Sequence, residues 1–168
     1  GPQCEVPIGF MDYSLDKLPT YQWSQDIGTT EVIGIKSRRL VEKEAIGVVA
    51  AITPWNVPLQ SNLAKCVPAL AAGCTVVLKA APDTPWSAAT LGRIVKQHTD
   101  IPPGVFNVIT SEDPKSVGDQ LVGDPRVDMV SFTGSTAVGK HIMARASETV
   151  KKVFLELGGK SANIILDD

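Results

Sequence analysis

An asparagine and a glutamate in this sequence have neighbours suited to catalysis. Asn56 follows the segment Thr-Pro-Trp, residues 53–55, directly after a short apolar run. Its side-chain amide can donate a hydrogen bond to an oxyanion that develops during a reaction. An asparagine ahead of a helix also often serves as a cap or turn residue, so this position alone leaves both roles open.

Glu156 lies within a strongly apolar segment, Val-Phe-Leu-Glu-Leu at residues 153–157. If these neighbours bury its carboxylate, the charged form is disfavoured and the group becomes a stronger base. Gly158 and Gly159 follow, and they permit a tight turn and the close approach of a ligand. The alternative is a glutamate on an edge strand that points into solvent.

Two further positions have the chemistry of phosphate or ribose binding. Lys79 ends an apolar run, where its ammonium group could reach a ribose hydroxyl or a phosphate; a solvated lysine is the alternative. Residues 132–136, Phe-Thr-Gly-Ser-Thr, follow a strand pattern and open a helix. The N–H groups of a helix start suit a pyrophosphate, although Gly-Ser-Thr is equally ordinary capping chemistry.

A nucleotide triphosphatase is a competing class of enzyme. Residues 134–140 read Gly-Ser-Thr-Ala-Val-Gly-Lys, which resembles a phosphate-binding Walker loop. That loop needs Ser or Thr next to ligate magnesium, and this chain has His141. The segment also lacks the second glycine of the G-x-G-x-x-G dinucleotide fingerprint.

From residue 45 onward, apolar β-branched runs alternate with segments of helical periodicity. We expect strands at 45–52, 74–78, 104–109, 127–132 and 150–157, with another starting at 162–166. Helices are expected from Pro58 to a stop at Gly73, at 84–99 with Thr84 as N-cap, at 114–122 and at 134–147. Ahead of these we expect a short amphipathic helix and loop at 5–18, and one or two strands at 31–43.

This alternation predicts an α/β fold, a parallel sheet with right-handed crossovers and helices on both faces. Ligands of such sheets bind beyond the carboxyl ends of the strands. The expected binding segments are therefore residues 53–56, 79–84, 110–113, 133–136 and 156–159.

Composition excludes several classes of function. The formal net charge of −2 favours neither nucleic acid nor an anionic membrane as a partner, and no apolar run is long enough to span a bilayer. Cys4, Cys66 and Cys74 form neither a metal-like spacing nor a disulfide framework, so we expect no metal and a cytoplasmic location.

The four motifs together resemble the aldehyde dehydrogenase family. Pro-Trp-Asn at 54–56, Lys79 with Thr-Pro at 84–85, Phe-Thr-Gly-Ser-Thr at 132–136 and Glu-Leu-Gly-Gly-Lys at 156–160 occur in this order and with this separation in that family. The similarity runs from about Gly28 to the end of the chain. It implies a Rossmann-like cofactor domain and the NAD(P)-dependent oxidation of an aldehyde to a carboxylic acid.

In the family, a cysteine thiolate forms a thiohemiacetal and then a thioester. The resemblance implies that Asn56 is the oxyanion donor and Glu156 the general base that activates water. It implies cofactor contacts from a larger set: Ile52, Thr53, Pro54, Trp55, Lys79, Pro82, Gly118, Gly134, Ser135, Val138, Leu157 and Gly158.

The family's nucleophile lies a few dozen residues beyond the position of Glu156, whereas this sequence stops at Asp168. Cys66 and Cys74 fall in an expected packed helix and a buried strand, and Cys4 lies near the first residue, so none can substitute. The sequence also opens Gly-Pro rather than with Met. We therefore expect an internal segment of a longer dehydrogenase, inactive by itself; a folded cofactor-binding or oligomerisation module without turnover is the alternative.

The resemblance also divides the chain. It implies an N-terminal helix and loop of the cofactor domain at 1–26, bridging strands at 27–45 that pair with a neighbouring subunit, and the NAD(P)-binding domain at 46–168. An unpaired strand edge favours such pairing, so we expect a homo-oligomer. A hairpin packed on its own domain is the alternative for residues 27–45.

Cofactor preference depends on one position. Many NAD-preferring members carry Glu three residues after the lysine, where it accepts a hydrogen bond from the ribose 2′-hydroxyl; here that position is Pro82. No carboxylate repels the extra phosphate of NADP there. We expect NAD, with NADP left open, and the sequence does not reveal which aldehyde is the substrate.

Overall fold

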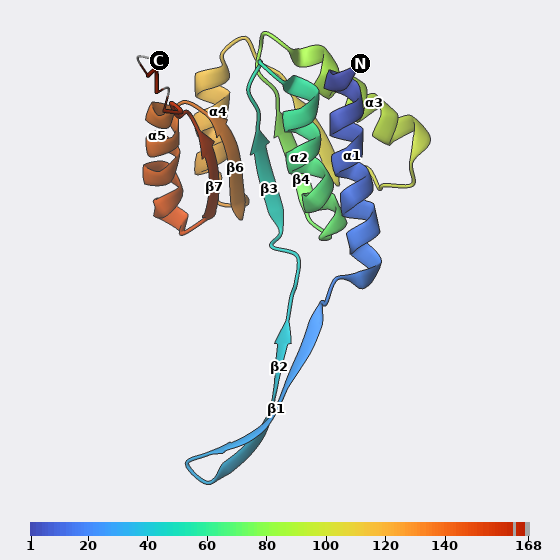
Figure 1. Cartoon of the computed structure of the whole chain (residues 1–168), viewed down its shortest axis with the longest axis vertical. Helices are drawn as coiled ribbons and strands as arrows, with labels where there is room; N and C mark the ends of the chain where they lie inside the picture. The colour runs from blue at the N-terminus through green and yellow to red at the C-terminus, as the bar shows by residue number, and fades with distance from the viewer. Residues whose placement is uncertain (163, 167–168) are drawn as a thin grey trace.

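The computed structural model describes residues 1–162 and 164–166, and its centre is a five-stranded parallel sheet (Figure 1). The strand order is β5-β4-β3-β6-β7. The strands are β3 (Val48–Ile52), β4 (Thr75–Lys79), β5 (Phe106–Ile109), β6 (Met129–Gly134) and β7 (Lys152–Leu157). The predicted α/β class is confirmed, and five of the predicted strands are present.

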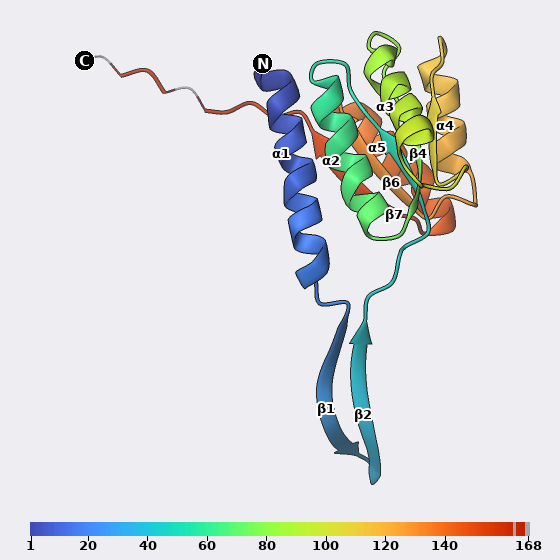
Figure 2. The same ribbon diagram turned by 90° about the vertical axis from the view of Figure 1, so that its right-hand side faces the viewer.

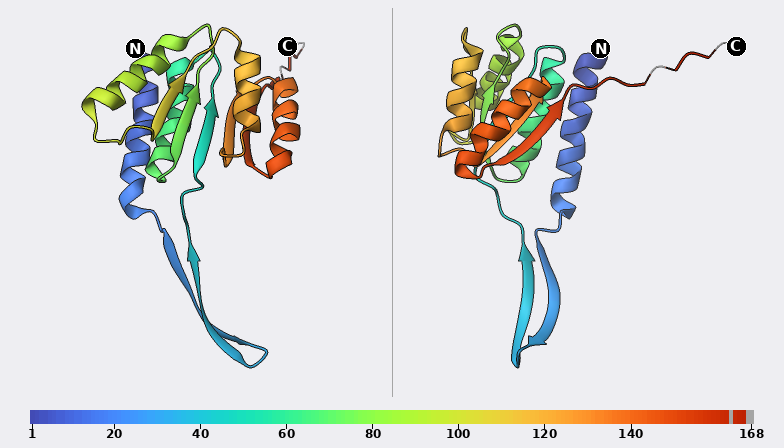
Figure 3. Two further views of the ribbon diagram at one scale, coloured as in Figure 1. Left: turned by 180° about the vertical axis from the view of Figure 1, so that it is seen from behind. Right: turned by 90° about the vertical axis from the view of Figure 1, so that its left-hand side faces the viewer.

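Helices cover both faces of this sheet because alternate residues of each strand point to opposite sides. Val49 and Ala51 of β3 pack in one core with residues of α2 and α3, while Ala50 and Ile52 pack in a second core with residues of α4 and α5. The helices are α1 (Pro2–Lys17), α2 (Pro58–Ala71), α3 (Pro85–His98), α4 (Pro114–Gly123) and α5 (Thr136–Ala146), with short 3₁₀ helices η1 (Leu18–Thr20) and η2 (Ser147–Thr149). Figure 3 shows the arrangement from behind and from the side.

An antiparallel hairpin, β1 (Ser24–Val32) and β2 (Ile35–Glu42), extends from the domain on the side opposite the carboxyl ends of the sheet (Figures 1 and 2). Its turn has positive φ at Ile33 (55°) and Gly34 (75°), as a two-residue type I′ connection requires. Arg38 and Asp26 form a salt bridge of 2.7 Å between the strands. The region predicted as one or two strands is therefore two strands, and the first begins earlier than expected.

Helix α1 lies outside α2, which separates it from the sheet (Figure 2). It is longer than the helix predicted at residues 5–18. Its Pro7 is fully buried.

The prediction that Thr84 is the N-cap residue of α3 is confirmed, although its hydroxyl accepts no capping hydrogen bond and has no partner among the described residues. One local prediction is wrong. The strand predicted from Ala162 is absent at residues 162 and 164–166, since these residues run away from the sheet (Figure 3) and pair with no described strand; residue 163 lies outside the described residues. An apolar run becomes a strand only where a neighbour accepts its backbone hydrogen bonds.

Candidate active site at the carboxyl edge of the sheet

The register of the strands brings the four sequence motifs to one edge. Ile52 at the end of β3 is aligned with Lys79 on β4 and with Phe132 on β6. On the other side of β6, Thr133 is aligned with Glu156 and Gly134 with Leu157. The carboxyl edge predicted from the alternation of elements therefore carries the motifs side by side.

A buried polar network supports the turn after β3. The Thr53 hydroxyl donates to Asn62 Oδ1 at 2.8 Å, and Asn62 Nδ2 donates to Ser87 Oγ at 3.3 Å. Thr53 N–H also donates to the carbonyl of Lys79 at 3.2 Å. Asn62 is 0% exposed, so it fixes this turn from inside the domain. Sequence reasoning missed Asn62, although an asparagine in an otherwise apolar helix face was a usable signal.

The tip of that turn is exposed. Trp55 is 63% exposed and Asn56 is also exposed, while Pro54 is half-buried. The N-cap position of α2 belongs to Val57, so Asn56 does not cap the helix. Asn56 therefore lies in a bend at the edge of the sheet with its side chain accessible to a ligand.

Lys79 is 4% exposed, which excludes the solvated alternative. Burial lowers the pKa of its ammonium group. Its Nζ donates to the Ala80 carbonyl at 3.4 Å. Gly118 of α4 lies beside it: a Cβ added to Gly118 would be 3.7 Å from Lys79 Cε. Two residues predicted to contact the cofactor, far apart in sequence, thus meet on the α4 side of the edge.

The start of α5 lies at the same edge. Ser135 is the N-cap, and its hydroxyl accepts a hydrogen bond from Val138 N–H at 3.3 Å. Ser135 and Val138 are exposed, whereas a Cβ on Gly134 would collide with the Phe132 ring. The capping role of Ser135 is confirmed; pyrophosphate binding by this helix start stays a prediction.

The Walker-loop alternative is wrong. That motif needs its glycine-rich stretch as a loop around phosphates. Here Gly134 still belongs to β6 and α5 already begins at Thr136, so only Ser135 separates strand from helix. His141 lies inside the helix and contacts Asp119 of α4.

Glu156 is exposed, so the predicted burial of its carboxylate is wrong. Alternation along β7 is the reason: Val153, Leu155 and Leu157 pack into the core below α4 and α5, and the residues between them face the other way. Leu157 packs closely under α5, since a Cβ on Gly139 would be 2.7 Å from its Cδ2. Gly158 is exposed beyond the strand.

The side chain of Glu156 lines an open hollow of about 730 Å³ on the α2 face of the sheet. Val57, the residue after Asn56, lines the same hollow, as does Lys65 of α2. Lys65 Nζ donates to Ser131 Oγ at 3.1 Å. Desolvation lowers the pKa of Lys65, and the charge of Glu156 opposes that change. Sequence reasoning missed Lys65, although it is the only charged residue within Pro58–Ala71.

Comparison with known proteins identifies the family. Residues 5–168 match the sequence profile described as "Aldehyde dehydrogenase family". The chain belongs to the aldehyde dehydrogenase family. It is 50% identical over 166 residues to a 3-succinoylsemialdehyde-pyridine dehydrogenase of a Pseudomonas species, covering 99% of this chain and 32% of that protein. The succinate-semialdehyde dehydrogenase [NADP(+)] GabD of Escherichia coli K12 is 48% identical over 131 residues, which cover 78% of this chain and 27% of GabD.

Solved structures agree with this assignment. An aldehyde dehydrogenase C mutant of Pseudomonas syringae, in complex with NAD+ and octanal, superposes with a TM-score of 0.86 at 41% identity and covers 99% of this chain and 32% of that one. An aldehyde dehydrogenase of Mycobacterium tuberculosis, complexed with NAD+, gives 0.83 at 41% identity, covering 96% and 32%. The chain thus spans about a third of the length of these relatives.

The cysteines of this family member do not form a nucleophilic site at the edge. Cys66 and Cys74 are buried in the core between α2 and the sheet. Burial raises the pKa of Cys66 to about 12, which keeps that thiol protonated. Cys4 is exposed on α1, outside α2. Pro82 is exposed in the loop after β4.

Neither a group of residues able to hold a metal ion nor a membrane-spanning helix is found in the described residues. Within residues 1–162 and 164–166, no three His, Cys, Asp or Glu side chains are grouped so that they could hold a metal ion. No helix in these same ranges has both the length and the apolar character needed to cross a membrane.

Proposed function

We propose that the protein containing this chain oxidises an aldehyde to a carboxylic acid with NAD(P), through a cysteine thiohemiacetal and thioester, and that residues 46–168 are its cofactor-binding part. The observation that carries this proposal is Lys79, buried beside Gly118 at the edge where α5 begins. A buried ammonium group is costly unless a partner compensates it. A bound ribose or phosphate supplies that partner.

The cofactor contacts follow from this placement. Lys79 binds the ribose or phosphate, Gly118 and Val138 border the cofactor from α4 and α5, and the N–H groups after Ser135 face the pyrophosphate. The walls of the site come from residues around the turn after β3 and the end of β7: Ile52, Thr53, Pro54, Trp55, Leu157 and Gly158. NAD is the expected cofactor and NADP is compatible with Pro82, since relatives are named for complexes with NAD+ and for NADP(+) dependence.

Asn56 and Glu156 are the proposed catalytic residues. The exposed Asn56 amide donates to the oxyanion, and Glu156 accepts a proton from the water that hydrolyses the thioester. The hollow beside Glu156 leaves room for that water. The nucleophile belongs to a part of the protein outside residues 1–168, because Cys66 is protonated, Cys74 is buried, and Cys4 lies on α1, outside α2. The isolated chain is then a folded module without turnover.

The hairpin of β1 and β2 is the proposed contact with a second copy of the chain, and residues 1–26 and 27–45 are the N-terminal and bridging parts. β1 and β2 pair with each other along their inner edges, and their two outer edges have no partner among the described strands. Several of its apolar side chains are exposed, among them Ile35 and Val41. Exposed strand edges with apolar side chains favour pairing with another chain.

The direct test is cofactor binding by the protein expressed from its complete coding sequence. Titration calorimetry with NAD and NADP should show binding that Lys79→Met weakens by roughly ten- to a hundredfold, the worth of a charge-assisted hydrogen bond. Lys96→Met, on the exposed surface of α3, is the matched control and should bind as the wild type does. Wild-type affinity in Lys79→Met would overturn the proposed cofactor site.

Aldehyde oxidation is tested separately, with a panel that includes semialdehydes because several relatives are named for them. We expect reduced cofactor from the complete protein and none from residues 1–168 alone. Turnover by the isolated chain that survives replacement of Cys4, Cys66 and Cys74 together would refute the thioester route.

A further inference from the structure

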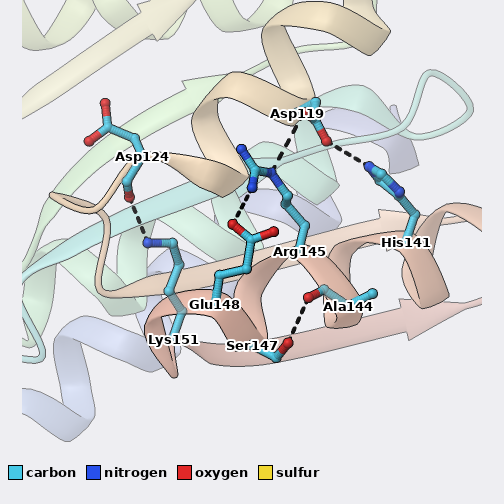
Figure 4. Close-up of polar contacts among 8 residues, drawn as sticks. All are labelled: Asp119, Asp124, His141, Ala144, Arg145, Ser147, Glu148 and Lys151. Atoms are coloured by element: carbon cyan, nitrogen blue, oxygen red, sulfur yellow. Dashed lines mark hydrogen bonds and ion pairs between the residues drawn. The ribbon is translucent and has the colours of Figure 1, made fainter.

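A polar cluster outside the proposed catalytic residues joins α4 to α5 (Figure 4). His141 Nε2 of α5 lies 2.6 Å from Asp119 Oδ1 of α4. Arg145, one turn further along α5, brings its Nε to 3.7 Å from Asp119 Oδ2. One carboxylate of α4 thus faces two nitrogen-bearing side chains of α5.

The packing of the two helices is adapted to these contacts. A Cβ added to Gly123 of α4 would be 2.5 Å from Arg145 Nη2, so the guanidinium lies directly against this glycine. Arg145 is also paired with Glu148, and this pairing raises the pKa of the guanidinium. Below the polar cluster, Val122 of α4 and Ile142 of α5 belong to the same buried core.

The cluster directly adjoins residues of the proposed cofactor site. Asp119 follows Gly118, which lies against Lys79. His141 lies three positions after Val138, on the same side of α5 because such residues are neighbours on a helix surface. A contact that ties Asp119 to His141 therefore ties the turn of α4 that carries Gly118 to the turn of α5 that carries Val138.

We propose that Asp119 and His141 are a positioning pair that sets the spacing between Gly118 of α4 and Val138 of α5, the two residues proposed to border the cofactor. The inference rests on the proposed cofactor site. The pair does not touch the reacting atoms; it holds α4 against α5, so that Gly118 and Val138 are in place before the cofactor arrives. The charged groups around His141 are Asp119 and, through it, Arg145 with Glu148; Lys140 is its neighbour in sequence.

The test is the affinity for NAD in Asp119→Asn, His141→Gln and the double variant of the complete protein. The pair is exposed, and exposed pairs are modest in strength, so each single change should weaken NAD binding about two- to fivefold. The double variant should bind NAD no more weakly than the single variant that has the lower NAD affinity. The swapped variant Asp119→His/His141→Asp should recover affinity. The maximal turnover rate should stay at the wild-type value in all of them.

Arg126→Gln is the matched control, since it breaks the Asp124–Arg126 pair, whose two residues follow α4. It should leave NAD affinity unchanged. Unchanged affinity in both single variants, or equal weakening in the control, overturns the positioning role; lowered thermal stability with wild-type affinity does the same. If the wild type binds neither NAD nor NADP, the proposed function itself fails, which is a distinguishable result.

Discussion

The Asn62 network allows a quantitative prediction about the turn that carries Asn56. Asn62→Leu keeps the approximate volume of the side chain but removes the acceptor of the Thr53 hydroxyl and the donor to Ser87. Thr53 is buried, so its hydroxyl gains no water in exchange. An unsatisfied buried hydroxyl costs about 1–3 kcal/mol. Ser87 is half-buried and recovers hydration, so it contributes little more.

Urea unfolding of the wild type and Asn62→Leu should therefore show a loss of about 1–3 kcal/mol in the free energy of unfolding. Thr53→Val/Asn62→Leu should regain much of it, because replacing both partners by apolar groups leaves no hydroxyl unpaired. Asn107→Leu is the control: Asn107 Nδ2 donates to the Gly104 carbonyl, away from this turn, so the variant should show no coupling to Thr53→Val.

A coupling free energy near zero between Thr53 and Asn62 would refute the reasoning, whatever each single variant costs. The same proteins connect stability to function. If Asn62 fixes the turn from inside, Asn62→Leu also displaces Asn56 and lowers the turnover rate of the complete protein. The single variant Ser87→Ala, which leaves the Thr53–Asn62 bond in place, should keep turnover close to the wild-type rate.

Three further outcomes are expected, the first two in the complete protein. Asn56→Ala should lower the single-turnover rate of acylation by about 10²–10³, the usual cost of losing one oxyanion donor; an unchanged rate assigns Asn56 to the bend alone. Glu156→Gln should keep a first-turnover burst of reduced cofactor while steady-state turnover falls by roughly 10²–10⁴, and wild-type values in both phases would remove its role as a base. Ile35→Lys/Val41→Lys, on one side of β2, should convert an associating protein to a smaller species in light scattering, whereas Lys36→Gln should not; a wild type that is already a clean monomer contradicts the hairpin proposal.

The sheet could be predicted because the residues that specify each strand and helix lie close together in the sequence. Apolar runs, proline at helix starts and the alternation of elements predicted β3 to β7 and the edge where the motifs meet. The failure at residues 162–166 follows from a property that no local pattern contains, the presence of a partner strand. The same limit applies to the hairpin: its strands follow from their composition, but association with a second copy stays a prediction, as does the cytoplasmic location.

The environment of each candidate residue was less predictable than its position. Lys79 and Glu156 each end or nearly end a strand, and each has apolar neighbours in sequence. Lys79 is buried because its strand lies inside the sheet and α4 brings Gly118 beside it. Glu156 is exposed because β7 is an edge strand and its side chain faces the side without α4 and α5. Burial depends on which elements lie next to the residue, and that is decided by distant parts of the chain.

Lys79 and Glu156 lie on opposite faces of the sheet, and this constrains the path of the cofactor. Lys79 and Gly118 lie on the face of the sheet covered by α4, whereas Glu156 lines the hollow on the face of α2. A cofactor bound at Lys79 must therefore cross the carboxyl edge before its reactive end approaches Glu156. The crossing requires space at the edge, and Gly158 after β7 leaves it, since a Cβ added there would meet no atom within 4 Å. In the proposed enzyme, Gly158 admits the cofactor between the two faces, and the exposure of Glu156 leaves its carboxylate accessible to water on the far side.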